Sequence, residues 1–234
     1  MGDDRFNLRW VSERHLRIGL GDDMTNETQR AVWAACQRLR AVNAGIVDLT
    51  PAYTSVLVAF DPLTLDVGAA EDAVARALEG LGAMDEGPQR GVEIAVCYEG
   101  VCGPDLEEMS RLLGLSSAEI VARHTGATYS VSFIGFAPGF AYLSGLPKEL
   151  AVARLAVPRT AVPAGSVGIA GEQTGVYPRA TPGGWRLIGR TPMVMFDASR
   201  ENPSMLEMGD EVSFVPMGLA AFEAAMAART EGAR

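Results

Sequence analysis

The sequence predicts a two-domain protein, in which an α+β domain over residues 1–88 precedes a mainly β barrel or sandwich over residues 89–234. Three observations support this division. Strand-like and helix-like patterns alternate through the first part. From Tyr129 onward the pattern changes to short strands interrupted by Gly and Pro, which is typical of a barrel or sandwich. A chain of 234 residues, 48% of them apolar, is long enough to bury the cores of one or two domains.

Residues 1–88 are expected to fold in the order strand, strand, helix, strand, strand, helix. Asn26 is the expected N-cap of the first helix, with Gln29 at the reciprocal position. Pro51 limits how central its strand can be, because proline lacks the N–H that a sheet needs. Two helices on one face of this sheet approximate a ferredoxin-like plan. The predicted strands cover residues 6–11, 15–20, 46–53 and 55–60, and the helices cover 26–43 and 68–82.

Residues 89–234 are expected to begin with a strand and two short helices. Asp105 is the expected cap of the first helix, and Ser116 with Glu119 forms a capping box for the second. His124 lies at the end of that helix, where the helix dipole favours it as a C-terminal cap. The tail, residues 219–230, is helical in pattern. The predicted strands cover residues 91–98, 129–136, 161–171, 174–178, 185–191, 193–197 and 210–216.

Charge and composition exclude several classes of protein. The chain has 20 basic and 29 acidic residues, and its formal charge of −9 disfavours binding to nucleic acid or to an anionic membrane. Small acidic substrates remain possible, since one or two arginines can bind a carboxylate. No secretory signal and no apolar run of about 20 residues occurs, so a cytoplasmic protein is expected.

The cysteines and the missing motifs narrow the chemistry further. Cys36, Cys97 and Cys102 are expected to be reduced and structural, and no metal site is expected, because the chain has two histidines and no C-x-x-C motif. There is no phosphate-binding P-loop and no G-x-S-x-G nucleophile motif. The sequence therefore predicts a pocket in the β-rich domain without a complete catalytic apparatus of its own.

The segment FIGFAPGF, residues 133–140, is the first stretch that points to a site. Gly139 allows a backbone approach that a Cβ would block, and Pro138 stiffens the turn. Phe136 and Phe140 lie on either side of this turn, where they form a pocket wall or a partner surface. Phe133 and Ile134 are better explained as core residues.

The segment VPRTAVPAGSVGIAGEQTGVYP, residues 157–178, adds polar groups to this glycine-rich region. Arg159 can pair with a carboxylate in a bidentate fork, and Gln173 and Thr174 can orient a ligand. Ser166 lies in a stretch with unobstructed backbone amides. The alternative is a barrel whose glycines serve corners and bulges.

The segment PGGWRLIGRTP, residues 182–192, continues the pattern. Trp185 can cover a pocket or a partner. Arg186 and Arg190 are expected on one face of a strand because four positions separate them. A solvated arginine face is the alternative interpretation.

These segments, together with GPDL at residues 103–106 and His124, resemble one family in order along nearly the whole chain. It is the family of the 5-oxoprolinase B subunit, also known as the Kip-type sporulation kinase inhibitor or allophanate hydrolase family. The last label is a poor match, because the Ser/Lys-rich amidase signature is absent.

The resemblance implies an N-terminal α+β domain followed by a cyclophilin-like β-barrel domain. It implies two partner proteins, the A subunit and the Kip-A-type C subunit, with which the chain hydrolyses 5-oxo-L-proline to L-glutamate. The cofactor implied is ATP with Mg²⁺, bound in the assembled complex rather than by a motif of this chain. Two alternatives remain: a non-catalytic inhibitor of a sensor histidine kinase, and a carboxyltransferase half of the urea carboxylase or allophanate type.

Residue chemistry within the matched motifs predicts the site. Arg159 and Arg190 are expected to anchor a carboxylate or phosphate, with Gln173 and Thr174 as polar orienting groups. These four are the predicted catalytic residues. The predicted substrate-binding residues are Phe136, Pro138, Gly139, Phe140, Ser166 and Trp185.

Overall fold

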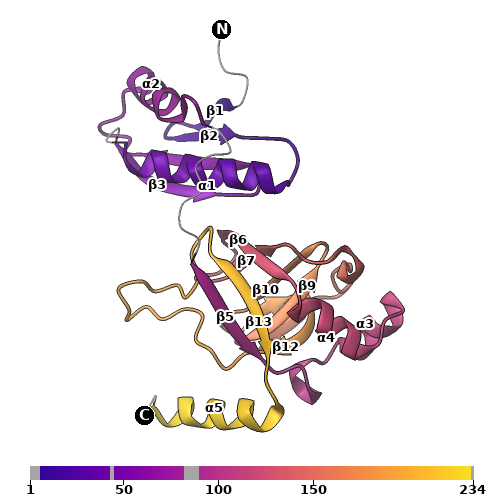
Figure 1. Cartoon of the computed structure of the whole chain (residues 1–234). Coiled ribbons are helices and arrows are strands. Elements are labelled where there is room, and N and C mark those ends of the chain that lie inside the picture. Colours follow the sequence, from indigo (N-terminus) through magenta and orange to yellow (C-terminus); the bar gives the residue numbers. More distant parts are fainter. Residues whose placement is uncertain (1–5, 43–44, 82–89, 233–234) are drawn as a thin grey trace. The chain divides into compact units, whose positions relative to one another are not determined.

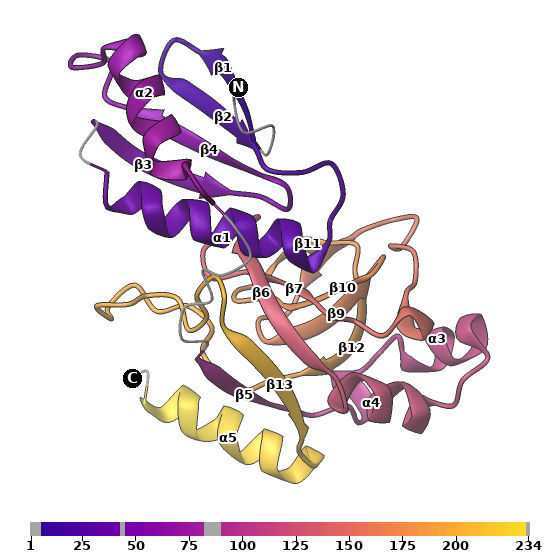
Figure 2. The same cartoon turned by 45° about the horizontal axis from the view of Figure 1, so that its top comes forward.

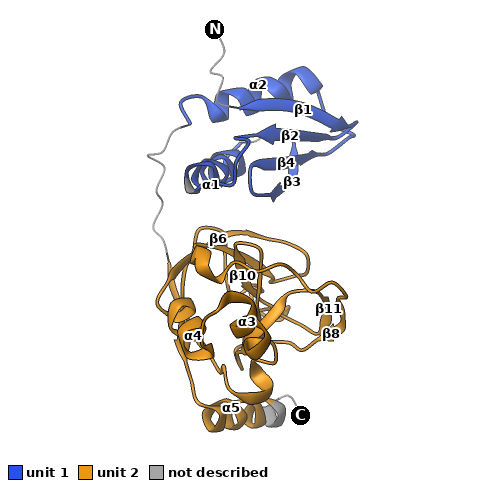
Figure 3. Cartoon of the chain, turned by 90° about the vertical axis from the view of Figure 1, so that its right-hand side faces the viewer, with its two compact units in different colours: residues 1–89 blue, residues 90–234 orange. Residues whose placement is uncertain are grey.

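The computed structural model describes residues 6–42, 45–81 and 90–232 (Figure 1). The chain divides into two compact units, Met1–Gln89 and Arg90–Arg234 (Figure 3). The sequence predicts a boundary after residue 88. The first unit holds α1 (Asn26–Arg40), α2 (Val67–Leu78) and strands β1 (Asn7–Ser12), β2 (His15–Gly19), β3 (Ile46–Pro51) and β4 (Ser55–Phe60).

The first unit is a four-stranded antiparallel sheet with two helices. Its strand order is β1-β2-β4-β3, and its elements follow one another as the sequence predicts. Pro51 ends β3, which is an edge strand, so the missing N–H costs no ladder hydrogen bond. The helices α1 and α2 contact each other, and α1 also packs on β3 and β4. The ferredoxin-like plan of this unit stays a prediction.

The N-cap of the first helix lies one position earlier than predicted. Thr25 is the N-cap, and its side chain accepts a hydrogen bond from the Thr28 backbone N–H at 3.1 Å, so the prediction of Asn26 as the cap is wrong. Asn26 is instead the first helical residue. Arg38, in the last turn, donates to the Glu79 carbonyl at 2.9 Å and so joins the ends of the two helices.

The second unit is built on a nearly closed, barrel-like sheet, as the sequence predicts. Its seven strands follow the order β12-β9-β10-β7-β6-β13-β5, and all neighbours are antiparallel except β13 and β5 (Figure 1). The strands are β5 (Gly91–Val96), β6 (Thr128–Ile134), β7 (Ala141–Ser144), β9 (Ser166–Ala170), β10 (Gln173–Val176), β12 (Arg186–Arg190) and β13 (Glu211–Pro216). A separate pair consists of β8 (Arg159–Val162) and β11 (Thr181–Gly183).

The two edge strands meet at Cys97 and Arg190. Each backbone N–H donates to the other residue's carbonyl at 2.8 Å, which joins the end of β5 to β12. Gly189 permits this approach, because a Cβ there would lie 2.5 Å from Val96 Cγ1 and 3.0 Å from the Cys97 carbonyl oxygen. Closure of the sheet therefore depends on a glycine at position 189.

Short helices surround the sheet. The helices α3 (Leu106–Leu113) and α4 (Ser117–Thr125) pack against each other (Figure 2), and α5 (Leu219–Gly232) follows β13. Two 3₁₀ turns, η1 (Gly100–Cys102) and η2 (Lys148–Leu150), precede α3 and follow β7. The capping box of α4 is confirmed, since Ser116 and Glu119 exchange both hydrogen bonds. No helix in the described ranges is long and apolar enough to cross a membrane.

Two other sequence predictions for this unit fail in part or in whole. Asp105 is the N-cap residue of α3, as predicted, but its carboxylate makes no capping hydrogen bond because it is engaged by the Leu187 N–H and by Arg159. Residues 193–197 are not a sheet strand. The Met195 carbonyl accepts from the Met205 N–H at 2.9 Å, so this segment pairs locally within a loop.

Candidate functional site

The turn between β6 and β7 holds an exposed aromatic side chain in an uncommon backbone conformation. Phe136 has φ 64° and is 61% exposed, and it is the one non-glycine residue with positive φ among those described. The Gly135 N–H donates to the Phe140 carbonyl at 3.0 Å across the turn. Gly139 is required by its φ of 80° and by a close approach, since a Cβ would lie 2.6 Å from the Phe196 Cβ. The turn therefore presents Phe136 and the exposed Pro138 outward.

Buried aromatic rings pack against this turn. Phe140 and Trp185 are buried, with ring centroids 5.3 Å apart in an edge-to-face contact, and Phe136 lies 5.4 Å from Phe140. We refer to Phe136, Phe140, Tyr142, Tyr177 and Trp185 as the aromatic cluster. Trp185 is thus part of the packing under the turn rather than an exposed cover.

Tyr177 is a polar member of this cluster that interacts with its surroundings. Burial raises the pKa of its phenol, while a hydrogen bond with the Trp185 backbone and the nearby charges of Arg154 and Arg159 lower it. Gly183 makes room for Tyr177, because a Cβ there would lie 2.5 Å from the phenol oxygen. The arginines place positive charge next to the cluster.

Arg159 is anchored by a buried carboxylate. Its Nη2 lies 2.5 Å from Asp105 Oδ1, and its Nη1 donates to the Trp185 carbonyl at 3.3 Å. The other oxygen of Asp105 accepts the Leu187 N–H at 2.6 Å. Because the Arg159 side chain remains 29% exposed, a ligand anion can still approach it while Asp105 holds it in place.

Arg186 and Arg190 do not share a strand face, so that prediction is wrong. The register of β12 against β9 shifts between Leu187 and Gly189, which inserts one extra residue into β12. Arg186 is paired with Ile169, which belongs to the main core, whereas Arg190 is paired with Ser166 on the opposite face. A bulge of one residue reverses the alternation on which the prediction depended.

The two arginines consequently make different contacts. Arg186 Nη1 lies 2.9 Å from Glu108 Oε1 without hydrogen-bond geometry, while its Nε donates to the Ala153 carbonyl. Arg190 Nε donates to the Ala164 carbonyl at 2.9 Å, and its guanidinium lies 5.7 Å from the centre of the Phe222 ring on α5. Arg190 thus packs against α5, and neither arginine belongs to the aromatic cluster.

Gln173 and Thr174 point to opposite sides of β10. Gln173 pairs with Ala170, whose side chain packs with Phe140 and Trp185, so Gln173 lies on the face of the aromatic cluster. Thr174 pairs with Ile169 of the main core and is fully buried. Ser166 is also buried. Thr174 therefore acts within the barrel rather than at an accessible surface.

His124 lies fully buried beside Thr174, so its predicted role as a helix cap is wrong. Its Nε2 is 3.0 Å from Thr174 Oγ1 and its Nδ1 is 2.9 Å from the Tyr98 hydroxyl. Thr174 donates its single proton to the Gly168 carbonyl at 3.0 Å, so Nε2 must be the protonated nitrogen and Nδ1 accepts from Tyr98. Burial lowers the pKa of His124 to about 3, which keeps the ring neutral.

Burial keeps two of the three cysteine thiols protonated. Cys36, Cys97 and Cys102 are free and buried. Burial raises the pKa of Cys36 to about 11 and that of Cys102 to about 12, so both remain poorly nucleophilic thiols. Within the described residues, no group of three or more His, Cys, Asp or Glu side chains is placed to hold a metal ion.

The structure brings part of the predicted site together. Phe136, Phe140, Trp185 and Arg159 are linked by contacts, and Gln173 lies on the same face. Thr174 is inside the barrel and Arg190 is against α5. Sequence reasoning missed Asp105 as the anchor of Arg159, although the residue lies in the motif GPDL, where a carboxylate among glycine and proline is a usable signal.

The chain matches known proteins over most of its length. Residues 6–206 match the family model "Carboxyltransferase domain, subdomain C and D". The chain is 42% identical over 207 residues to the 5-oxoprolinase B subunit of Escherichia coli O157:H7, covering 88% of this chain and 94% of the relative. It is 38% identical over 222 residues to the 5-oxoprolinase B subunit of Bacillus subtilis, covering 90% and 92%.

Solved structures also match most of this chain. TTHA0988 matches with a TM-score of 0.76 and 36% identity, over 87% of this chain and 40% of that chain, so this chain spans less than half of TTHA0988. The urea amidolyase of K. lactis, at 18% identity with a TM-score of 0.73 over 94% of this chain and 15% of that chain, shows likeness of fold alone. From its family-model match and its near full-length relatives, this chain belongs to the family of the 5-oxoprolinase B subunit.

Proposed function

We propose that this chain is the B subunit of an ATP-dependent 5-oxoprolinase complex, which hydrolyses 5-oxo-L-proline to L-glutamate together with the A and C subunits. The observation that carries the proposal is the identity of 37 to 42% to three proteins named as this component of 5-oxoprolinase, over about the whole length of each. A role in a hydrolase complex also agrees with the anchored arginine and the aromatic turn that the described residues form.

The substrate surface that we propose is the face bearing the aromatic turn. Phe136 and Pro138 would contact the ring of 5-oxoproline, and the exposed part of Arg159 would bind its carboxylate. Gln173, on the same face, would orient the amide. Thr174 and Arg190 would support this surface indirectly, through the barrel interior and through the contact with α5.

The fold assignments and the cofactor belong to the same proposal. We assign a cyclophilin-like barrel to residues 90–234, supported by the nearly closed sheet, and a ferredoxin-like plan to the first unit. ATP with Mg²⁺ would bind in the assembled complex, where a phosphate-binding motif of a partner would hold it. Within this chain, Arg159 is the group best placed to meet an anion that such a partner presents.

The test is reconstitution with the A and C subunits of the same genome. Glutamate release from 5-oxoproline is measured with and without ATP, and with and without this chain. ATP-dependent release that disappears when this chain is omitted supports the proposal. Gln173→Ala should lower turnover without loss of assembly, while the control Glu172→Ala, at an exposed neighbouring position, should retain it. A well-formed complex that releases no glutamate would contradict the proposed reaction.

A second candidate function is a carboxyltransferase half that acts on a urea-type substrate. The family model of carboxyltransferase subdomains C and D favours it. If the reconstituted complex releases no glutamate, transfer of a carboxyl group from carboxybiotin to urea is the next assay. Turnover in that assay, with none on 5-oxoproline, would replace the first proposal by the second. A chain that only inhibits a histidine kinase would support neither of these two reactions.

A further inference from the structure

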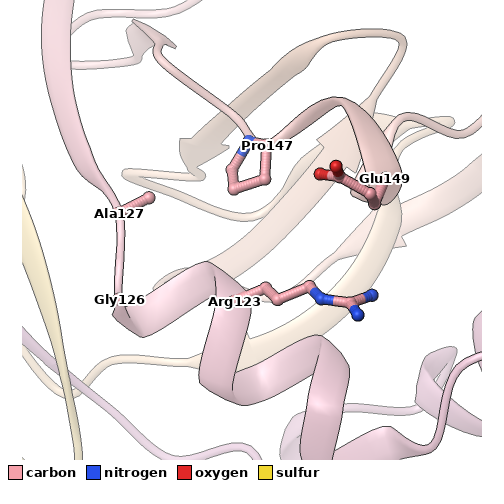
Figure 4. A pocket seen from close by; sticks show the side chains of 5 residues that line it. All are labelled: Arg123, Gly126, Ala127, Pro147 and Glu149. Atoms are coloured by element: carbon pink, nitrogen blue, oxygen red, sulfur yellow. The ribbon is translucent and has the colours of Figure 1, made fainter.

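A small cavity, widely open to solvent, lies between the end of α4 and η2, outside the motifs assigned above. Its volume is about 290 Å³, and Arg123, Gly126, Ala127, Pro147 and Glu149 line it. Figure 4 shows these residues around one space, with Arg123 projecting from α4, Pro147 directly before η2 and Glu149 on η2 itself. The volume is at the lower end of ligand pockets, so the cavity suits a small molecule.

Arg123 supplies a positive group to the lining of the cavity. Among the described residues its Nη1 is buried without a hydrogen-bond partner, which is costly for a charged donor, and the part of the guanidinium that lines the cavity is the part a ligand reaches. Glu119, one turn earlier on α4, interacts with Arg123 electrostatically, but its Oε2 already accepts from the Ser116 N–H at 2.8 Å and the Ser116 hydroxyl at 2.7 Å. A guanidinium in this state suits a carboxylate ligand.

Glu149 supplies the opposite charge on the other side of the cavity. Its side chain is exposed, and it forms no ion pair with Arg123 among the described residues. The C-terminal end of α4 reaches the cavity at Gly126, and this end of a helix carries partial negative charge. The two features together favour a cation next to Glu149.

We propose that this cavity binds a small zwitterionic amino acid. The carboxylate of the ligand pairs with Arg123, and its ammonium group faces Glu149 and the end of α4. Ala127 and Pro147 provide the apolar wall for a short side chain. A simple anion is disfavoured by Glu149 and a simple cation by Arg123, which is why a ligand with both charges fits best. The site does not depend on the proposed function.

The first test is an NMR titration of the full chain with L-alanine, N-acetyl-L-alanine and L-alaninamide. L-alanine should produce saturable shifts of the Gly126 and Ala127 amide signals. The other two compounds, which lack the ammonium or the carboxylate charge, should bind about tenfold more weakly, since each loses one charge-assisted contact. Absence of saturable shifts at these amides, or equal binding of all three compounds, overturns the proposal.

Matched variants then assign the charges. Arg123→Gln should weaken L-alanine binding about tenfold and remove its advantage over L-alaninamide. Glu149→Gln, at an exposed position that the fold tolerates, should remove the advantage of L-alanine over N-acetyl-L-alanine. Arg111→Gln, an exposed arginine on α3, is the control and should bind as the wild type does. Wild-type selectivity in the Glu149→Gln variant rules out the assigned orientation.

Discussion

His124 Nε2 and Thr174 Oγ1 lie 3.0 Å apart inside the barrel, although fifty positions separate the two residues in the chain. The contact links the end of α4 to β10, and the Tyr98 hydroxyl extends it on the other side of the ring. A neutral imidazole satisfies both partners, because Nε2 donates to Thr174 and Nδ1 accepts from Tyr98, whereas a protonated ring would turn Nδ1 into a donor and so end its acceptance of the Tyr98 proton. The network therefore depends on His124 remaining neutral.

The stability of the second unit should fall as the pH drops below about 6.5. His124 has a folded-state pKa of about 3, below its ordinary value of 6.5, so the unfolded chain binds this proton first. Its contribution is complete above pH 6.5 and is lost as the pH falls toward 3, by up to about 1.4 kcal/mol per pH unit. Urea unfolding at pH 7.5 and 5.0 measures this difference.

The control for this prediction is the other histidine of the chain. His124→Asn should flatten the pH dependence of unfolding, while His15→Asn, in the first unit, should leave the fall in stability in place. A pH dependence that is the same in His124→Asn as in the wild type would show that this ring does not titrate as proposed.

Removing Arg159 should destabilise the fold as well as the site. Arg159→Ala leaves the buried Asp105 carboxylate without its charged partner, although the Leu187 N–H still donates to it, and we expect a loss of about 1 to 3 kcal/mol in the free energy of unfolding, the lower range reflecting the partial exposure of Arg159. Arg159→Ala combined with Asp105→Asn should lose less than the sum of the two single changes. Additive losses in that cycle would argue against a direct pair.

An exposed ion pair provides the comparison for Arg159. Arg200 lies 3.1 Å from Asp197 with both side chains accessible, so Arg200→Ala should change the free energy of unfolding by about 0.5 kcal/mol or less. Denaturant unfolding of both variants under one buffer condition separates the buried pair from the exposed one. Equal effects would show that burial of Asp105 contributes little.

Gly189→Ala should weaken closure of the barrel. The added methyl would meet the Val96 side chain and the Cys97 carbonyl, and we expect a loss of about 1 to 3 kcal/mol in unfolding free energy. Gly91→Ala, at the start of β5, has open space around the new methyl and should have a small effect. Amide hydrogen exchange at Cys97 and Arg190 should accelerate in the first variant alone.

Phe136→Gly separates the exposed turn from the core beneath it. Relief of the left-handed backbone conformation, about 1 kcal/mol, should offset the lost contact with Phe140, so stability should change by less than about 1 kcal/mol. Phe140→Ala, in the buried part of the cluster, should cost about 3 to 5 kcal/mol. If Phe136 belongs to the substrate surface, glutamate formation by the reconstituted complex should fall about tenfold with Phe136→Gly.

Features specified by near neighbours in the chain could be predicted from the sequence. Ser116 and Glu119 are three positions apart, so their capping box follows from local hydrogen bonding. Pro51 lacks an N–H, and its strand is at the sheet edge. The glycine-proline turn at residues 133–140 is predictable as a stiff turn with aromatic residues on either side for the same local reasons.

Features that depend on strand register and on burial were decided by the tertiary structure. A one-residue bulge in β12 places Arg190 and Arg186 on opposite faces of the sheet. No local pattern shows where the register between β12 and β9 shifts. The Asp105 carboxylate binds Arg159 and the Leu187 N–H instead of an N–H of α3, and both partners are more than fifty positions away in the chain.

The amino-acid sequence alone specifies the order of elements in the first unit, the α4 cap and the aromatic turn, since these follow from patterns and contacts among near neighbours in the chain. The faces of Arg190 and Thr174, and the burial of His124, depend on contacts between distant segments that form only when the sheet closes.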